Sequence, residues 1–351
     1  MSEPELIGGR EGGLGRLTLN RPQALGALTL GMCRAMIAAL TEWRKDPSVM
    51  AVMIDHAGER GFCAGGDIRM LAESGAGDGA AAFEFFHTEY RLDHLISVYP
   101  KPVIAIMDGV TMGGGVGISL PARWRIATER TRFAMPETGI GLFPDVGAGW
   151  WLPRLPGRTG LWLALTGARL EAADCKATHI ATDVVSSSDL PGLKAALAAD
   201  PAHAHRIIRD HHADLGPPPL TKLRRQIDRL FAGDSLEAVF AALEADTGHW
   251  AKAQLEAIRP KSPMSAKVSF RLLAGGLAPA SLAEDLVTEY RLARRIVQSH
   301  DFLEGVRAVI VDKDNAPRWS PDTLAGMTDA MTDALFAPLA PGEEWTPLPD
   351  A

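Results

Sequence analysis

Up to about residue 190, the chain repeats one local pattern: a short apolar run, a glycine-rich loop, and then a stretch with helical spacing. Alternation of this kind predicts an α/β fold built of stacked ββα units rather than a simple meander. The expected strands are residues 14–20, 49–55, 103–107, 124–127 and 132–134, and the clearest expected helices are residues 28–43 and 80–98.

Beyond residue 190 the pattern changes, because strand signals nearly vanish while helical spacing continues. A length of 351 residues is also more than one average domain needs. We therefore expect a mixed core over residues 1–190 and a helical region over residues 191–351, ending in a loose tail rich in Pro and acid from residue 338. The expected helices are residues 193–199, 220–231, 236–254, 266–273, 282–300 and 323–336.

Charge and hydropathy limit the partners of this chain. It has 36 Lys and Arg against 43 Asp and Glu, a net charge of −7, so nothing indicates the basic face that nucleic acid needs. No apolar stretch reaches the roughly 18 residues of a membrane span. We expect neither nucleic acid nor a membrane as a partner.

The cysteines and the first ten residues bear on the compartment. Cys33, Cys63 and Cys175 are odd in number, widely spaced and form no CxxC pair, which disfavours a disulfide framework or a zinc site. Residues 1–10 carry acids and have neither the apolar core of a signal peptide nor the Arg-rich character of a transit peptide. The sequence therefore predicts a cytoplasmic protein that holds no metal.

Two glycine clusters, GFCAGGDIR at residues 61–69 and DGVTMGGGVG at residues 108–117, each follow an apolar run. Such loops leave backbone N–H groups unpaired and let a ligand approach closely. Two of them could aim two N–H donors at one carbonyl oxygen and form an oxyanion hole. The alternative is that these glycines only make tight turns. Neither cluster has P-loop or dinucleotide-fold spacing.

Two acids, Glu137 and Asp145, lie in the apolar stretch FAMPETGIGLFPDVGAG at residues 133–149. Removal from water would raise the pKa of a carboxyl group there and suit it to general acid–base work. The alternative is structural, with Glu137 capping a helix and Asp145 in a turn. The order of two glycine loops followed by two acids in an apolar segment favours catalysis.

These motifs resemble the crotonase superfamily, and in detail its 3-hydroxyisobutyryl-CoA hydrolase branch. The resemblance covers nearly the whole chain, and several motifs agree in order. It rests on FCAGGDIR (62–69), DGVTMGGGVG (108–117), FAMPETGIGLFPDVGAG (133–149), SPMSAKVSFRLL (262–273), EYRL (289–292) and DFLEGVRAVIVDKDNAPRW (301–319).

The resemblance implies a crotonase-like spiral of repeated ββα units with a helical C-terminal region. It implies a short 3-hydroxyacyl-CoA thioester as substrate, with coenzyme A as part of that substrate and no separate cofactor. The backbone N–H groups of Gly66 and Gly114 would form the oxyanion hole. Other residues would lie near the substrate: Glu89, Ile68, Asp67 and Gly65.

One departure from the superfamily pattern selects the branch. Enoyl-CoA hydratases use two Glu residues; one matches Glu137, but the position of the other is Gly117 here. The acid at Asp145, where hydratases usually have a small residue, agrees with the hydrolase branch. We expect hydrolysis of 3-hydroxyisobutyryl-CoA, a step of valine breakdown. An enoyl-CoA hydratase or isomerase and a non-catalytic acyl-CoA binder remain as alternatives.

Several details stay open from the sequence. Glu137 could attack the thioester as a nucleophile or activate a water. Lys313 could meet a phosphate of CoA or belong to a solvated charge run. The pair Trp150-Trp151 could narrow the acyl pocket. Relatives in the superfamily often form trimers or hexamers, so a homo-oligomer is expected.

Overall fold

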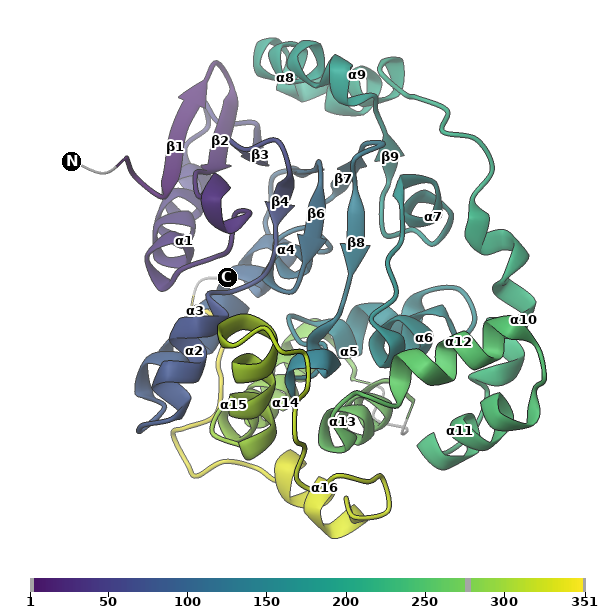
Figure 1. The fold of residues 1–351 in the computed structure, drawn as a ribbon. Helices are drawn as coiled ribbons and strands as arrows, with labels where there is room; N and C mark the ends of the chain where they lie inside the picture. The colour runs from purple at the N-terminus through teal and green to yellow at the C-terminus, as the bar shows by residue number, and fades with distance from the viewer. Residues whose placement is uncertain (1–2, 275–278, 350–351) are drawn as a thin grey trace.

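A computed structural model describes residues 3–274 and 279–349 of the chain and shows a large sheet, a small sheet and many surrounding helices (Figure 1). The large sheet has the strand order β1-β2-β3-β5-β7-β9; β1 and β2 are antiparallel and the remaining pairs are parallel. Its strands are β1 (Leu6–Glu11), β2 (Leu14–Leu19), β3 (Ala51–His56), β5 (Val103–Met107), β7 (Trp124–Ala127) and β9 (Asp183–Val184).

The small sheet is parallel and has the order β4-β6-β8. Its strands are β4 (Gly61–Cys63), β6 (Val110–Met112) and β8 (Arg132–Ala134). The chain therefore places one strand in each sheet and then turns into a helical segment, three times in succession. This repetition confirms the predicted spiral of ββα units, and β5, β7 and β8 begin and end where the sequence predicted.

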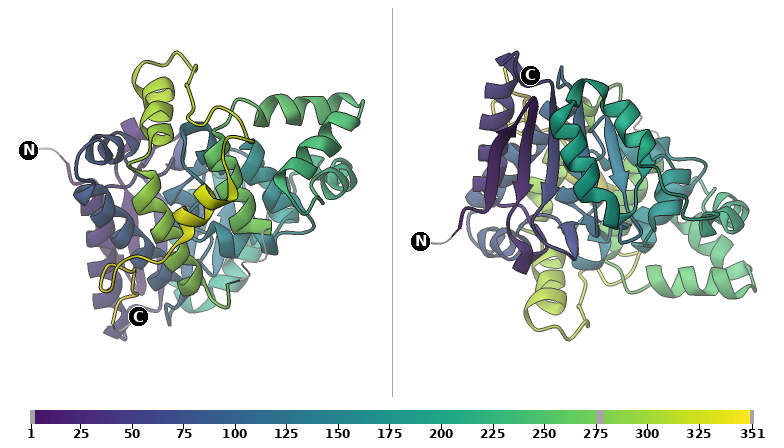
Figure 2. Two further views of the ribbon diagram at one scale, coloured as in Figure 1. Left: turned by 90° about the horizontal axis from the view of Figure 1, so that it is seen from below. Right: turned by 90° about the horizontal axis from the view of Figure 1, so that it is seen from above.

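Each face of the large sheet has its own helical cover. Side chains that alternate along the strands, such as Met53 and Ile104, pack with α8 (Leu190–Ala199) and α9 (Ala204–Asp210). Their neighbours Val52 and Ile54 face the main core, to which α1 (Leu30–Lys45) and α3 (Ala80–Ser97) contribute. Figure 2 shows α8 and α9 lying over the strands in the view from above. Alternate side chains of each strand point to opposite faces of the sheet, and both faces are buried. The strands therefore read as continuous apolar runs in the sequence.

The remaining helices surround the small sheet and the loops that follow it, with α10–α12 to the right and α13–α16 below in Figure 1. In the first half they are α1 (Leu30–Lys45), α2 (Ile68–Gly75), α3 (Ala80–Ser97), α4 (Gly114–Gly117), α5 (Ala148–Trp151), α6 (Thr159–Thr166) and α7 (Ala172–Ala177). In the second half they are α10 (Arg224–Leu230), α11 (Leu236–Ala245), α12 (His249–Ile258), α13 (Pro263–Ala274), α14 (Leu282–Ile296), α15 (His300–Val306) and α16 (Asp329–Phe336).

Two predicted helices differ in extent from the structure. Residues 236–254 form α11 and α12, because the Asp246 side chain accepts a hydrogen bond from the N–H of Gly248 (2.8 Å) and turns the chain. The helix predicted over residues 282–300 is α14, which ends at Ile296; a new helix, α15, begins at His300, where Ser299 caps it by accepting from the N–H of Phe302 (3.2 Å). Helical periodicity continues across both breaks, so only the caps reveal them.

The expectation of a loose tail is wrong for Trp345, which is 1% exposed. Its indole N–H donates a hydrogen bond to the carbonyl of His87 on α3 (3.2 Å), and its ring packs edge-on against that of His94. Arg91 also donates to Thr346 (2.8 and 3.0 Å) and Arg291 pairs with Glu344 (2.9 Å), so the tail is anchored although its composition indicated disorder. The boundary near residue 190 stays a prediction, and helices from both sides of it contribute to the main core.

Candidate active site

Three loops meet at the carboxyl edge of the small sheet, because β4, β6 and β8 are adjacent and parallel. Gly66 follows β4, Gly114 follows β6 and Glu137 follows β8. Each therefore occupies the same place in successive ββα units. The carboxyl ends of parallel strands are where open α/β sheets present their ligand sites.

The two glycine loops approach each other more closely than other residues would allow. Gly65 and Gly113 have φ of +119° and +47°, and a Cβ added to Gly113 would lie 3.1 Å from the Cα of Gly65. Gly66 and Gly114 come directly after these two residues. In the described part of the chain, no group accepts a hydrogen bond from the N–H of Gly66 or Gly114.

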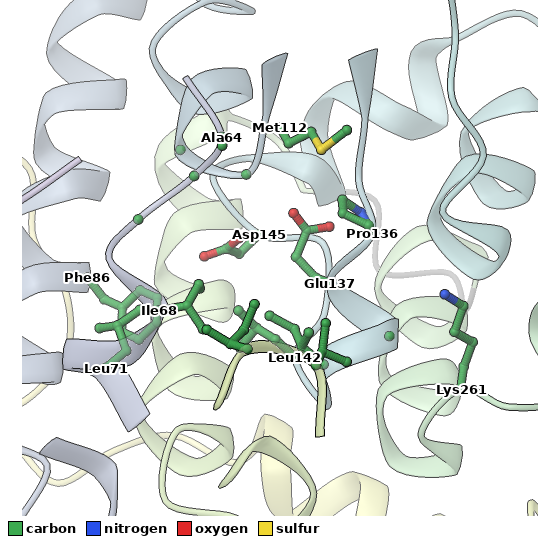
Figure 3. Close-up of a pocket in the computed structure, with 18 of the residues that line it drawn as sticks. Ala64, Ile68, Leu71, Phe86, Met112, Pro136, Glu137, Leu142, Asp145 and Lys261 are labelled. Carbon is green, nitrogen blue, oxygen red and sulfur yellow. The ribbon is translucent and has the colours of Figure 1, made fainter. Parts of the chain in front are cut away.

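A cavity of about 520 Å³ opens at this junction, and Figure 3 shows the side chains that line it. Its wall is mostly apolar, with three carboxyl groups and one ammonium group. The predicted residues Gly65, Gly66, Ile68, Glu89, Gly114, Glu137 and Asp145 all line it. The apolar wall includes Leu71, Phe85, Phe86, Met112, Ile140, Leu142, Val309 and Ile310.

Glu137 is the first residue of the 3-10 turn η2 (Glu137–Ile140) and is 6% exposed to solvent. Among the described residues its Oε2 atom has no hydrogen-bond partner. Burial, and secondly the nearby Asp145, raise the pKa of Glu137 well above its ordinary value, while Lys261 acts in the opposite direction. A buried carboxyl group that lines a cavity and has an unpartnered oxygen can act on a ligand there.

Asp145 lies beside Glu137 in the cavity (Figure 3). Its Oδ2 accepts a hydrogen bond from the hydroxyl of Tyr90 on α3 (2.9 Å). Burial raises the pKa of Asp145 to about 6, and the hydrogen bond from Tyr90 opposes that rise. The two carboxyl groups therefore have different partners, which is the arrangement that divides acid and base roles.

The loop after Asp145 is attached to α14. Glu289 accepts hydrogen bonds from the N–H groups of Gly147 (2.7 Å) and Gly149 (3.1 Å), and Asp285 accepts from that of Trp150 (2.7 Å). These acids satisfy the first N–H groups of α5. A helix of the C-terminal region thereby holds the loop that carries Asp145.

Glu89 and Asp93 are buried one turn apart on α3, beneath the second glycine loop. A Cβ added to Gly114 would lie 2.3 Å from Oε1 of Glu89, and one added to Gly117 would lie 2.6 Å from Oδ2 of Asp93. Gly117 is therefore glycine because Asp93 occupies the space where a side chain would go. Burial is the main reason that the pKa values of Glu89 and Asp93 are raised.

Some predicted or considered residues lie away from the cavity wall. Asp67 caps α2, accepting from the N–H of Met70 (3.4 Å), and pairs with Arg21. Lys313 is exposed, and Trp150 stacks on Arg154. In residues 3–274 and 279–349, no cluster of His, Cys, Asp or Glu could hold a metal ion, and no helix is long and apolar enough to cross a membrane.

The sequence analysis missed the roles of Tyr90, Lys261 and Glu289. Tyr90 lies in an aromatic stretch of α3 and is fully buried, which by itself indicates only packing. Glu289 stands within EYRL, a motif that already carried the family resemblance, so the signal was present without a function attached to it. Lys261 directly precedes the motif SPMSAKVSFRLL, and only the folded chain brings it to the cavity.

The fold and the cavity define a crotonase-type acyl-CoA enzyme, and comparison with known proteins agrees. Residues 14–336 match the enoyl-CoA hydratase/isomerase family, and the chain belongs to that family. The predicted superfamily and the predicted crotonase fold are thereby confirmed.

The most similar relatives include proteins named "3-hydroxyisobutyryl-CoA hydrolase, mitochondrial". The one from Danio rerio is 45% identical over 344 residues, covering 95% of this chain and 90% of the relative. The one from Homo sapiens is 40% identical, covering 93% and 86%. These names confirm the predicted hydrolase branch. They contradict the cytoplasmic prediction, which was wrong because it took missing targeting signals as evidence of a compartment.

Two solved structures superimpose closely on this one. A protein described as a carnitinyl-CoA dehydratase from Mycobacterium thermoresistibile has a TM-score of 0.93 at 40% identity, covering 98% of this chain and 99% of that one. A protein described as an enoyl-CoA hydratase from Rhodobacter sphaeroides has a TM-score of 0.91 at 42% identity, covering 98% and 100%.

Proposed function

We infer that this chain hydrolyses 3-hydroxyisobutyryl-CoA to 3-hydroxyisobutyrate and CoA, a step of valine degradation. The carrying observation is a single cavity lined by two glycines with unused backbone N–H groups and by Glu137, which has an unpartnered carboxylate oxygen, in a chain 40–45% identical to hydrolases of that name. A hydrolase of this kind needs a group that stabilises an oxyanion and a group that attacks or activates water.

The thioester oxygen is placed on the N–H groups of Gly66 and Gly114. Each such donor stabilises the transition state by about 3–4 kcal/mol, because negative charge develops on that oxygen. Glu137 attacks the carbonyl carbon to give a mixed anhydride, or it removes a proton from an attacking water. In either route the carbon–sulfur bond breaks and CoA leaves as the thiolate or, once protonated, as the thiol.

Asp145 holds the 3-hydroxyl group of the substrate or transfers a proton. Its hydrogen bond from Tyr90 fixes the direction of the carboxyl group and leaves its other oxygen for the substrate. Glu89, beside Gly114, lies next to the bound carbonyl. The apolar side chains of the wall, including Ile68, exclude water from the acyl group.

The reaction as proposed uses side chains and backbone only, so no cofactor besides the CoA of the substrate takes part. An assembly into trimers or hexamers stays part of the proposal, as it is common in the superfamily. Lys313 is exposed, lies between residues of the cavity wall in the sequence, Ile310 and Asn315, and would contact the CoA phosphates.

The test is release of free thiol from 3-hydroxyisobutyryl-CoA, with hydration of crotonyl-CoA followed alongside on the same enzyme preparation. Rapid thiol release with little hydration is the expected result. Turnover in oxygen-18-labelled water, followed by mass spectrometry of the peptide that contains Glu137, detects the anhydride route when water attacks at Glu137. Label in the Glu137 carboxylate requires the anhydride route with water attacking the Glu137 acyl carbon.

A second candidate function is hydration of an enoyl-CoA, favoured by the descriptions of the two closely superimposed structures. Against it stands Gly117, because a side chain there would collide with Asp93. Hydration without thiol release would establish this second function. Tight binding of CoA esters with no turnover of either substrate would establish a non-catalytic acyl-CoA binder.

A further inference from the structure

Lys261 provides the only positive charge among the described residues that line the cavity, against the carboxyl groups of Glu89, Glu137 and Asp145. Its side chain is half-buried, and no described side chain forms an ion pair or hydrogen bond with its ammonium group. Burial lowers the pKa of Lys261, and the charge of Glu137 opposes that effect. A cation kept in this place at a cost in solvation needs an explanation.

The backbone holds Lys261 in place beside the turn that carries Glu137. The N–H of Ser262 donates a hydrogen bond to the carbonyl of Thr138 (3.3 Å), the residue after Glu137. Ser262 also caps α13, accepting from the N–H of Ser265 (3.1 Å). The position of Lys261 relative to Glu137 is therefore fixed by main-chain contacts rather than by a surface loop.

Two glycines make room for the ammonium group. A Cβ added to Gly139 would lie 3.0 Å from Nζ of Lys261, and one added to Gly167 would lie 3.7 Å from it. Figure 3 shows Glu137 between Asp145 and Lys261 in the view. The carboxyl group of Glu137 thus has a second acid on one side and a cation on the other.

We propose that Lys261 is a positioning residue that acts through Glu137: its ammonium group keeps Glu137 in the charged form that thioester hydrolysis requires. The inference rests on the proposed function. The other titratable groups that line the cavity in the described residues are the acids Glu89 and Asp145. Asp145 opposes the charged form of Glu137, and Lys261 favours it.

The experiment compares the pH dependence of kcat/KM in the wild type and in Lys261→Met and Lys261→Arg. kcat/KM rises with pH as Glu137 ionises. Loss of the cation should therefore shift this rise to higher pH by about one pH unit. In Lys261→Arg, which keeps a positive charge, the rise should lie close to that of the wild type. The control is Lys267→Met, which removes a charge from α13 whose partner is Glu237 (2.8 Å), outside the cavity, and should leave the rise unchanged.

Each profile is measured with 3-hydroxyisobutyryl-CoA and with the N-acetylcysteamine thioester of the same acid, which carries no phosphate. An equal upward shift with both substrates supports the proposal. A loss confined to the CoA ester would mean that Lys261 binds a phosphate instead, and a rate reduced equally at every pH would mean a structural role. Either result overturns the proposal.

Direct titration separates this proposal from the proposed function. Carboxyl-labelled glutamate, with the Glu137 signal assigned by its loss in Glu137→Gln, reports the ionisation of Glu137 by NMR without turnover. A Glu137 that titrates at higher pH in folded Lys261→Met supports the proposal even if no thiol is released. An unchanged titration overturns it even in an active enzyme.

Discussion

The molecule contains two groups of buried acids that look alike in charge and burial but differ in their partners. The first group, here the cavity acids, comprises Glu89 and Glu137, which line the cavity, and Asp93, which lies one turn along α3 from Glu89. The second, the α14 acids, comprises Asp285 and Glu289. All five are nearly inaccessible to water, and burial is the main cause of a raised pKa in each.

The α14 acids are satisfied by three backbone N–H groups at the start of α5. Each of the cavity acids, by contrast, keeps at least one buried oxygen without a partner in the described residues. A buried unpaired oxygen is costly, so a folded chain keeps one only where something else requires it. A raised pKa alone therefore does not locate an active site, whereas a raised pKa combined with an unused oxygen facing a cavity does.

The largest expected effect separates the two groups by activity. Glu137→Gln keeps the size of the side chain but removes its charge, so thiol release should fall about a thousandfold. Thermal unfolding should occur at the same or a higher temperature, because an unpartnered carboxyl group has been replaced by a neutral one. Near-normal turnover would remove Glu137 from the reaction.

Glu289→Gln, in contrast to Glu137→Gln, should lower the stability of the fold more than it lowers activity. An amide has one accepting oxygen, so one of the N–H groups of Gly147 and Gly149 loses its partner. The free energy of unfolding, from urea titration, should fall by about 2 kcal/mol. The control is Glu84→Gln at an exposed site on α3. If both variants were equally stable, the α14 acids would not hold the Asp145 loop.

Tyr90→Phe tests the acid that has one partner and also faces the cavity. The hydroxyl of Tyr90 favours the charged form of Asp145, so its removal should raise the pKa of Asp145 above about 6. We expect about a tenfold loss of kcat/KM at neutral pH, recovered in part at higher pH. Tyr99→Phe, which removes a hydrogen bond to the carbonyl of Leu40 (2.8 Å), should leave the profile unchanged.

The smallest effect concerns stability and pH. Burial raises the pKa of Asp285 from 3.8 to about 7, so the folded state favours the protonated form. The stability that this preference contributes is complete below about pH 3.8 and is lost as pH rises toward 7. Asp285→Asn cannot ionise and keeps an oxygen for the N–H of Trp150. Between pH 5 and 8 the free energy of unfolding of this variant, from urea titration at each pH, should fall by about 1 kcal/mol less than that of the wild type. Equal falls in the two proteins would contradict this.

Local patterns in the sequence were enough to predict much of this protein. Short runs of strand-forming residues identified β5, β7 and β8 with their ends, and β5, which follows Pro102, is buried along its whole length. The glycine clusters and the acids at 137 and 145 were visible as residue types in an unusual context. Motif order then supplied the family.

Only the tertiary structure decided which of these residues meet. The parallel pairing of β4, β6 and β8 brings Gly66, Gly114 and Glu137 to one edge, although they are far apart in the sequence. Tyr90 on α3 bonds to Asp145, Glu289 on α14 holds the loop after it, and Lys261 reaches the cavity from the bend before α13. Helical periodicity says only that one face of a helix is buried. Sequence spacing records contacts within a turn of helix or a step of strand, and a site made between separate elements depends on how those elements pack.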